Sequence, residues 1–406
     1  MFTRKLNNTL HSILSDTPAL LITGPRQSGK TTLVKSLSPN MAYFTLDDEL
    51  DRSYALTDPT GFIRRSERMI IDEIQRAPNL LFAIKKSIDD NRQPGRFILT
   101  GSTDVLTMPS FADSLAGRME NLTLLPLSQA EMVDSHTNWL DAVFSGNIPA
   151  PNQCDIGEVF IDKIISGGYP EVIARNSEKR KQDWCVQYVN ALLTRDILDV
   201  AGISKAAQMP KFLGIIAQMA GGLSNAARAA GEICIDRKTA AKYMGILEQM
   251  YLIKEVPSWS SNAISRIVKS PKIQFIDSAI LATLLGQTKS SLLRDRSAMG
   301  ALTESFVLSE LLKMSNYSDH RYRFSHYRDA LKNEVDFVVE NERNDIVAIE
   351  VKASATVGMN DFKGIKHFQS LVGSNLIAGI MLYDGNEIKS VGDSLWAVPL
   401  SSLWAG

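Results

Sequence analysis

The residues whose types and spacing most clearly indicate chemistry form a glycine-rich stretch from Gly24 to Thr31, which fits G-x-x-x-x-G-K-[ST]. Backbone N–H groups of such loops surround nucleotide phosphates, and the lysine meets the β- and γ-phosphates. The hydroxyl of Thr31 is expected to sit on Mg²⁺, so the stretch predicts binding of ATP with Mg²⁺. The residues predicted to contact the nucleotide are Gly24, Pro25, Arg26, Gln27, Ser28, Gly29, Lys30, Thr31, Thr32, Asp72 and Ser102.

Further reactive groups follow other apolar runs of the same region. Asp72 is expected beside the Mg²⁺ ion, and Glu73, one residue further, can polarise the attacking water as a general base. Thr100 and Ser102 end the next run, where a hydroxyl can sense the γ-phosphate or simply stabilise a turn. Arg118 is a candidate arginine finger, acting within its own chain or in a neighbouring copy; an ordinary surface arginine is the alternative.

A second acidic set lies near the C-terminus. Side chains alternate along a strand, so Glu334 and Asp336 share one face, as do Glu350 and Lys352. Charges on such apolar strands are costly unless they are paired or bound to metal. Asp336 and Glu350 are therefore predicted to hold Mg²⁺ with help from Glu304, while Lys352 orients the water, as in the D…ExK pattern of phosphodiesterases. The alternative is an inert, solvated sheet edge.

The surrounding pattern predicts a multidomain α/β protein. Alternating strands and helices indicate a parallel sheet covered by helices around the glycine-rich loop. Three helices followed by strands indicate a winged helix, whose recognition helix over 236–250 would expose Arg237, Lys238 and Lys242 to DNA or to solvent. The predicted domains are a P-loop ATPase core over 1–130, a helical lid over 131–204, a winged helix over 205–285 and a nuclease-like α/β domain over 286–406.

The strand that precedes the acidic set in the sequence carries alternating basic and aromatic residues, over 321–324 and 326–328. Such a strand could follow a nucleic-acid backbone and stack bases. It could equally be a two-sided strand with its aromatic side chains in the core, which is the interpretation we prefer.

The composition is that of an ordinary globular protein. The 406 residues carry a net charge of −1, so any surface for nucleic acid must be local. Only three cysteines occur, which excludes a disulfide scaffold and suits a reducing cytoplasm. No apolar run approaches the roughly 18 residues that a membrane span needs. We expect a cytoplasmic protein without membrane contact, which could form a homo-oligomer.

Taken together, the motifs resemble those of the bacterial and archaeal AAA-like ATPases whose C-terminal domain is similar to PD-(D/E)xK nucleases. The resemblance rests on GPRQSGKTTL (24–33), IIDEIQRAP (70–78), LTGS (99–102), LAGR (115–118), GGYPEV (167–172), TRDI (194–197), EVDF (334–337) and IEVKAS (349–354). It implies ATP binding, an ATPase core of the AAA-like ASCE group, a winged helix and a nuclease-like end. One departure from the nuclease pattern is that no proline precedes Asp336.

Two functions remain open at this stage. The first is an ATPase that is coupled to a DNA-acting, nuclease-like domain, with Mg²⁺-dependent cleavage in genome defence. The second is a nucleotide-switched regulator whose winged-helix and nuclease-like domains only bind DNA or a protein partner.

Overall fold

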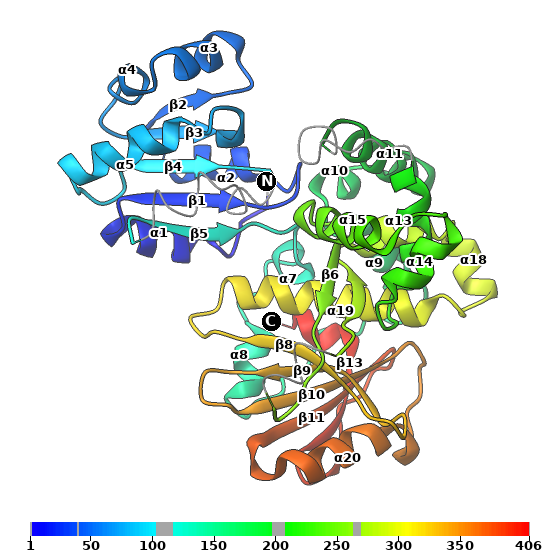
Figure 1. The fold of residues 1–406 in the computed structure, drawn as a ribbon. Coiled ribbons are helices and arrows are strands. Elements are labelled where there is room, and N and C mark those ends of the chain that lie inside the picture. Colours follow the sequence, from blue (N-terminus) through cyan, green and yellow to red (C-terminus); the bar gives the residue numbers. More distant parts are fainter. Residues whose placement is uncertain (1, 39, 103–116, 197–207, 263–268, 406) are drawn as a thin grey trace. The chain divides into compact units, whose positions relative to one another are not determined.

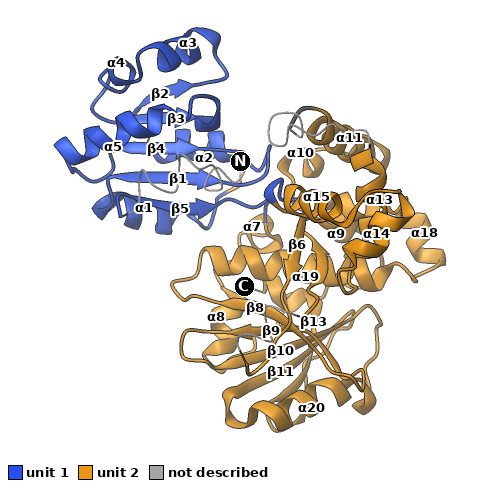
Figure 2. Ribbon diagram, viewed as in Figure 1, with its two compact units in different colours: residues 1, 3–127, 249–251 blue, residues 2, 128–248, 252–406 orange. Residues whose placement is uncertain are grey.

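The computed structural model describes residues 2–38, 40–102, 117–196, 208–262 and 269–405 (Figure 1). These residues form two compact units (Figure 2). The first unit contains residues 3–127 with 249–251, and the second contains 128–248 with 252–406. Two of the sequence motifs, 115–118 and 194–197, lie partly outside the described residues.

The first unit is built on a parallel sheet of five strands in the order β2-β3-β4-β1-β5. The strands are β1 (Ala19–Thr23), β2 (Ala42–Thr45), β3 (Met69–Asp72), β4 (Phe97–Thr100) and β5 (Met119–Thr123). The helices are α1 (Asn7–Asp16), α2 (Lys30–Leu37), α3 (Glu49–Thr57), α4 (Pro59–Ile63) and α5 (Leu80–Asp90). The predicted parallel sheet is confirmed, although its fifth strand begins earlier than the expected 122–125.

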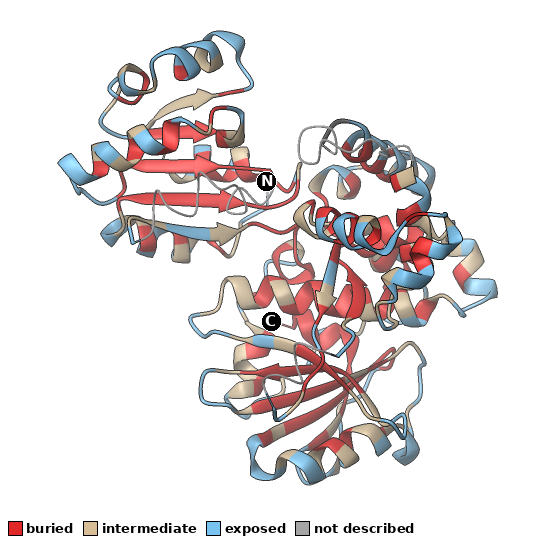
Figure 3. Cartoon of the chain, viewed as in Figure 1, coloured by how far each residue is buried: buried red, intermediate tan, exposed pale blue. Residues whose placement is uncertain are grey.

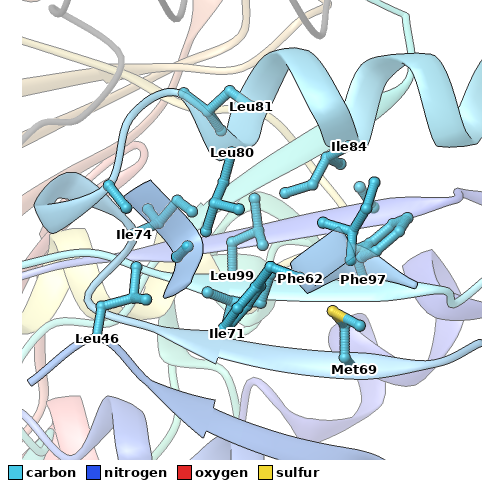
Figure 4. Packing of buried hydrophobic residues seen from close by; sticks show 14 of the residues in the cluster. Leu46, Phe62, Met69, Ile71, Ile74, Leu80, Leu81, Ile84, Phe97 and Leu99 are labelled. Carbon is cyan, nitrogen blue, oxygen red and sulfur yellow. The ribbon is translucent and has the colours of Figure 1, made fainter. Parts of the chain in front are cut away.

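The three inner strands β1, β3 and β4 are buried along their whole length (Figure 3). Parallel strands read as continuous apolar runs because both faces of their sheet are covered. Their side chains pack with the buried face of α5 in one hydrophobic cluster, which includes Ile71, Leu80, Ile84, Phe97 and Leu99 (Figure 4). This rigid core fixes the strand ends that carry the predicted catalytic residues.

The second unit begins with helices, as predicted for the region after residue 130. They are α7 (Gln129–Met132), α8 (Trp139–Phe144), α9 (Glu158–Ser166), α10 (Pro170–Ile173) and α11 (Glu178–Ala191). Three more helices follow, α13 (Met209–Gln218), α14 (Ala226–Glu232) and α15 (Arg237–Gln249), and then the antiparallel pair β6 (Ile253–Val256) and β7 (Lys272–Phe275). As expected for a helix N-cap, the Asp236 carboxylate accepts a hydrogen bond from the Thr239 N–H at 2.9 Å.

The same unit ends in a six-stranded mixed sheet of order β12-β13-β11-β10-β9-β8. Its strands are β8 (Arg323–Arg328), β9 (Glu334–Glu340), β10 (Ile346–Lys352), β11 (Leu376–Tyr383), β12 (Lys389–Gly392) and β13 (Leu395–Pro399). Helices of this part are α17 (Ser278–Leu284), α18 (Lys289–Arg294), α19 (Met299–Asn316) and α20 (Lys363–Val372). None of the helices in the described part of the chain is long and apolar enough to cross a membrane.

Strand β8 forms the end of this sheet, and a short segment after β6 runs along it. His326 donates its N–H to the Pro257 carbonyl at 2.9 Å and accepts from the Trp259 N–H at 2.6 Å. The side chain of Tyr327 belongs to the core cluster with Trp259 and Phe368. This agrees with the preferred interpretation of the basic and aromatic strand, while Arg323 stays exposed.

Candidate functional site

The glycine-rich loop follows β1 and leads directly into α2. Gly24 has φ 140°, and a Cβ there would collide with the carbonyl oxygen of Leu124. Gly29 has φ 98° and lies immediately before the first residue of α2. Both are left-handed conformations that favour glycine, so the loop geometry depends on these two residues.

The side chain of Lys30, the first residue of α2, is buried against the backbone of the preceding loop. Its Nζ donates to the carbonyl oxygens of Gly24 and Pro25, at 2.9 Å each. Burial lowers the pKa of Lys30 to about 8, although the nearby carboxylates of Glu73 and Asp72 oppose this shift. The hydroxyl of Ser28 is buried and has no hydrogen-bond partner among the described residues. The loop therefore holds a cation and a hydroxyl that phosphate oxygens can engage.

Asp72 is the last residue of β3, and its carboxylate accepts hydrogen bonds from three hydroxyl groups. Its Oδ2 accepts from the Thr31 hydroxyl at 2.9 Å and from the Tyr43 hydroxyl at 2.7 Å. Its Oδ1 accepts from the Thr100 hydroxyl. The structure thus brings Thr31 and Asp72 together, as the sequence predicted, because the parallel strands β1 and β3 end at the same edge of the sheet with β4 as the one strand between them. Burial and the hydrogen bond to Asp72 raise the pKa of Tyr43 above its usual value.

Glu73 adopts a left-handed conformation with φ 61°, which is uncommon for a residue with a side chain. Its N–H donates to the Thr100 hydroxyl at 3.1 Å. Its carboxylate accepts from the side-chain amide of Gln75 and from the Ser102 hydroxyl, the latter at 3.3 Å. The same Gln75 amide donates to Ser102 at 2.9 Å. The candidate base, Ser102 and Gln75 therefore form one hydrogen-bonded group.

Arg118 lies away from this group. It precedes β5, whose first residue Met119 pairs with Ala19, whereas the loop follows the other end of β1. Its Nε donates to Asp89 at 2.6 Å, and this contact holds the pKa of the Asp89 carboxyl below its usual range. This placement does not favour a catalytic role within the same chain, so action in a neighbouring copy and an ordinary surface arginine are the two interpretations that stay open.

In the second unit, several predicted carboxylates surround a lysine that the sequence analysis did not include. Nζ of Lys272, the first residue of β7, lies 2.7 Å from Asp336 Oδ1, 2.9 Å from Glu334 Oε1 and 3.2 Å from Glu304 Oε2. The Lys272 side chain is only 2% exposed. Burial opposes its charge, but the carboxylates of Asp336, Glu304 and Glu334 raise the pKa of Lys272 above its ordinary value. The lysine is therefore a permanent cation.

The remaining two residues of the predicted set behave differently from each other. Glu350 has one buried carboxylate oxygen, Oε2, without a hydrogen-bond partner among the described residues. Burial and the charge of Asp336 raise its pKa well above the usual value. Lys352 is 38% exposed, and its Nζ lies 4.0 Å from Glu350 Oε1. Lys352 therefore forms only a long ion pair with Glu350.

The carboxyl groups of Glu304 and Asp336, which both contact Lys272, also interact with other groups. Burial and the charge of Asp336 raise the pKa of Glu304 to about 8, although Lys272 opposes the shift. Asp336 itself turns its second oxygen to the backbone, where Oδ2 accepts from the Val351 N–H at 2.9 Å. The backbone pairing between β9 and β10 ends at Ile349 and Phe337. Beyond this pair, the Asp336 side chain supplies a hydrogen bond from β9 to β10.

Residues 16–133 match the family model described as the AAA domain. The match spans β1, the loop, Asp72 and Glu73, and thus the geometry described for the first unit. The N-terminal part of the chain is thus similar to AAA domains and has a P-loop NTPase-like α/β fold with a parallel sheet, and we call it the AAA domain below.

Two domains of unknown function match the regions after the AAA domain, over residues 157–291 and 299–403. An uncharacterized protein of Mycobacterium tuberculosis is 26% identical over 97% of this chain and 82% of its own length. One of Methanocaldococcus jannaschii is 21% identical over 95% and 87%. These relatives extend over both units.

Solved structures resemble the chain more distantly. A Walker-type ATPase of Pyrococcus abyssi has a TM-score of 0.43 at 15% identity, over 70% of this chain and 96% of its own. AMPPCP-bound DnaA of Aquifex aeolicus has a TM-score of 0.30 at 13% identity, over 60% and 85%. At these low TM-scores, neither similarity supports an inference about function.

The residues of the AAA domain fit a magnesium ion. Mg²⁺ prefers oxygen ligands, keeps several waters and is held by one or two carboxylates together with substrate phosphates. Thr31 and Asp72 supply a hydroxyl and a carboxylate whose oxygens are already 2.9 Å apart. They would hold the ion, which would supply positive charge to neutralise the charge that develops on the phosphates.

The C-terminal carboxylates do not fit a metal ion in the same way. Asp336 and Glu304 face the ammonium of Lys272, which occupies the space that their oxygens share. In the described part of the chain, no group of three His, Cys, Asp or Glu residues is arranged to hold a metal. The magnesium site of Glu304, Asp336 and Glu350 stays a prediction, and the cation that the structure places beside Glu304 and Asp336 is Lys272.

Proposed function

We propose that the AAA domain binds ATP with Mg²⁺ and hydrolyses it. The observation that carries this proposal is the Thr31–Asp72 hydrogen bond beside Lys30, with Glu73 one residue further along the chain. In this scheme the loop amides and Lys30 hold the phosphates, and Thr31 and Asp72 hold the metal. Glu73 accepts the proton of the attacking water, while Ser102 and Gln75 orient its carboxylate.

Replacing the base tests this assignment. Glu73→Gln should bind ATP with nearly unchanged affinity but hydrolyse it roughly 10²–10⁴-fold more slowly, because an amide cannot take up the proton. Glu67→Gln is the matched control, since Glu67 is exposed and lies before the other end of β3. Turnover near that of the wild type in Glu73→Gln would place the base elsewhere.

We further propose that Arg118 acts on the nucleotide of a neighbouring copy. The support for this form of the hypothesis is that Arg118 precedes β5, at the end of the sheet opposite to the one where the loop follows β1. Mixing Arg118→Ala chains with Lys30→Ala chains should then restore part of the turnover, since each variant supplies what the other lacks. Activity that is independent of protein concentration and shows no such rescue would argue against it.

For the second unit we propose a regulatory role, in which the state of the bound nucleotide controls binding of DNA or a protein partner. The order of α13, α14, α15, β6 and β7 supports a winged helix, and Arg237, Lys238 and Lys242 are exposed on α15. A PD-(D/E)xK-like fold for the terminal sheet remains part of the proposal. Lys272 among the carboxylates favours binding over metal-dependent cleavage.

Two measurements on the full chain test this role. Replacing Arg237, Lys238 and Lys242 by alanine should weaken DNA binding and reduce its salt dependence, since each phosphate contact adds to the slope. Replacing the exposed lysines Lys179, Lys366 and Lys389 serves as the control. DNA or RNA cleavage with Mg²⁺ or Mn²⁺ that is lost in Asp336→Ala would instead favour the nuclease.

A further inference from the structure

The position of Lys272 has a consequence that is independent of ATP hydrolysis. An ammonium group has three N–H donors, and three carboxylates lie within 3.2 Å of Lys272 Nζ. The group is therefore saturated, and it needs no water or anion from outside the chain. Ions buried in this way are tolerated only when partners of opposite charge surround them.

The partners come from elements that are distant in the sequence. Glu334 and Asp336 belong to β9, and Glu304 belongs to α19, whereas Lys272 opens the second strand of the β6–β7 pair. Gln274 on the same strand adds a hydrogen bond to Glu304 Oε2 at 3.0 Å. The charged cluster thus joins the β6–β7 pair to the terminal sheet and its long helix.

A third segment, the turn at Gly221 and Gly222 after α13, lies beside the cluster. The Gly221 N–H donates to the Ile273 carbonyl at 2.8 Å, and the Ile273 N–H donates to the Gly222 carbonyl at 3.0 Å. A Cβ on Gly221 would lie 3.3 Å from Glu304 Oε2. The turn after α13 therefore lies against the Glu304 carboxylate.

We propose that Lys272 is a built-in cation that takes the place predicted for the metal ion and fastens the β6–β7 pair to the terminal sheet. A divalent ion and the ammonium cannot share these oxygens, because both are cations and Mg²⁺ requires oxygens at about 2.0–2.1 Å. The second unit should therefore keep its structure without metal and gain no stability from it. This proposal does not rest on the ATPase assignment and can fail or succeed separately.

The first test removes the charge and keeps the length of the side chain. Lys272→Met in the full chain should lower the unfolding temperature of the second unit by roughly 5–10 °C, because the buried carboxylate of Asp336 and the half-buried carboxylates of Glu304 and Glu334 lose their cation. Lys254→Met is the matched control: Lys254 lies on the neighbouring strand β6, is 45% exposed and pairs with Glu248. A loss in Lys272→Met no larger than in this control would overturn the fastening role.

A second variant separates a lost ion cluster from simple misfolding. Adding Asp336→Asn to Lys272→Met should recover part of the loss, since the double change removes a charge that the single change leaves unpaired. If Lys272→Met does not accumulate in folded form, Asp336→Asn alone gives a milder test, with a smaller loss than Lys272→Met is expected to cause. Unchanged stability in Asp336→Asn, or no recovery in the double variant, would contradict the cluster.

Metal binding provides the third readout. Calorimetry with Mn²⁺ and no nucleotide should detect no binding that depends on Asp336, and Mn²⁺ should not raise the unfolding temperature of the second unit. Asp336→Asn in the presence of Lys272 is the comparison. Mn²⁺ binding in the wild type that disappears in Asp336→Asn would show that a metal displaces the lysine and would overturn the proposal.

Discussion

The two acidic sites of this chain use the same side chain in opposite ways. Asp72 accepts hydrogen bonds from the neutral hydroxyls of Thr31, Tyr43 and Thr100. Asp336 accepts from the ammonium of Lys272 and from a backbone N–H. A hydroxyl can turn its oxygen toward an arriving cation, whereas an ammonium has no acceptor and repels one. The group that faces a carboxylate therefore decides whether a strand end can take a metal.

Removing divalent ions gives the sharpest contrast between the two sites. Excess EDTA should abolish ATP hydrolysis, because the ion that Thr31 and Asp72 would hold is needed to neutralise the phosphates. The unfolding temperature of the second unit should change by less than about 2 °C, since Lys272 remains in place. Parallel turnover assays and thermal unfolding would test this, and a large loss of stability with EDTA would erase the difference between the sites.

The lysines of the two sites should also differ in role: we expect Lys30 to support nucleotide binding and Lys272 to support the stability of the second unit. Lys30→Ala should reduce ATP binding and turnover by roughly 10²-fold or more, because it removes the charge on the terminal phosphates. The fold of the AAA domain should survive, since the Lys30 ammonium donates its hydrogen bonds to two loop carbonyls in the described part of the chain. Nucleotide titration and turnover provide the measurement, with the exposed Lys86→Ala as control. Normal affinity in Lys30→Ala would remove the loop from the nucleotide site.

The smallest effect concerns Glu350, whose carboxyl lies beside the lysine cluster without a partner for Oε2. Its pKa is raised above the unfolded value, so its contribution to stability is present at low pH and is lost as pH rises. Glu350→Gln keeps the shape without the charge and should raise the unfolding temperature at pH 8 by roughly 2–4 °C. Little change is expected near pH 4.

Thermal unfolding of the Glu350 variant at both pH values checks this sign, with the exposed Glu171→Gln as control. A lower unfolding temperature of Glu350→Gln at pH 8 would mean that the charged carboxylate has a counter-ion. That result would bring the C-terminal site closer to the metal site that the sequence suggested.

Local patterns were sufficient to predict that Thr31 and Asp72 lie close together. The loop follows a buried strand, and parallel strands end at one edge of their sheet, so Asp72 had to lie near Thr31. Tyr43, which donates one hydrogen bond to Asp72, and Gln75, which donates to Glu73 and Ser102, were not predicted, because neither belongs to the residues that the phosphate-loop pattern specifies. Gln75 had a signal in retrospect, since it lies two residues after the candidate base in IIDEIQRAP.

The second site required information that no local pattern contains. Lys272 lies 64 residues before Asp336 and belongs to a different part of the unit. The rule that buried carboxylates need a counter-charge was sound, but Lys352 was the nearest cation in the sequence and a metal was the simplest addition. The tertiary contacts of β7 with α19 and β9 place another lysine, Lys272, among the acids.

The hydrogen bonds between His326 and the segment after β6 limit where this chain can be cut into separately expressed fragments. A fragment that began at residue 286 would contain every strand of the terminal sheet but neither Pro257 nor Trp259. It would expose the backbone of His326 on β8, and unpaired strand edges recruit other chains into aggregates. Such a fragment should be poorly soluble, whereas one that begins before α13 carries its own edge protection.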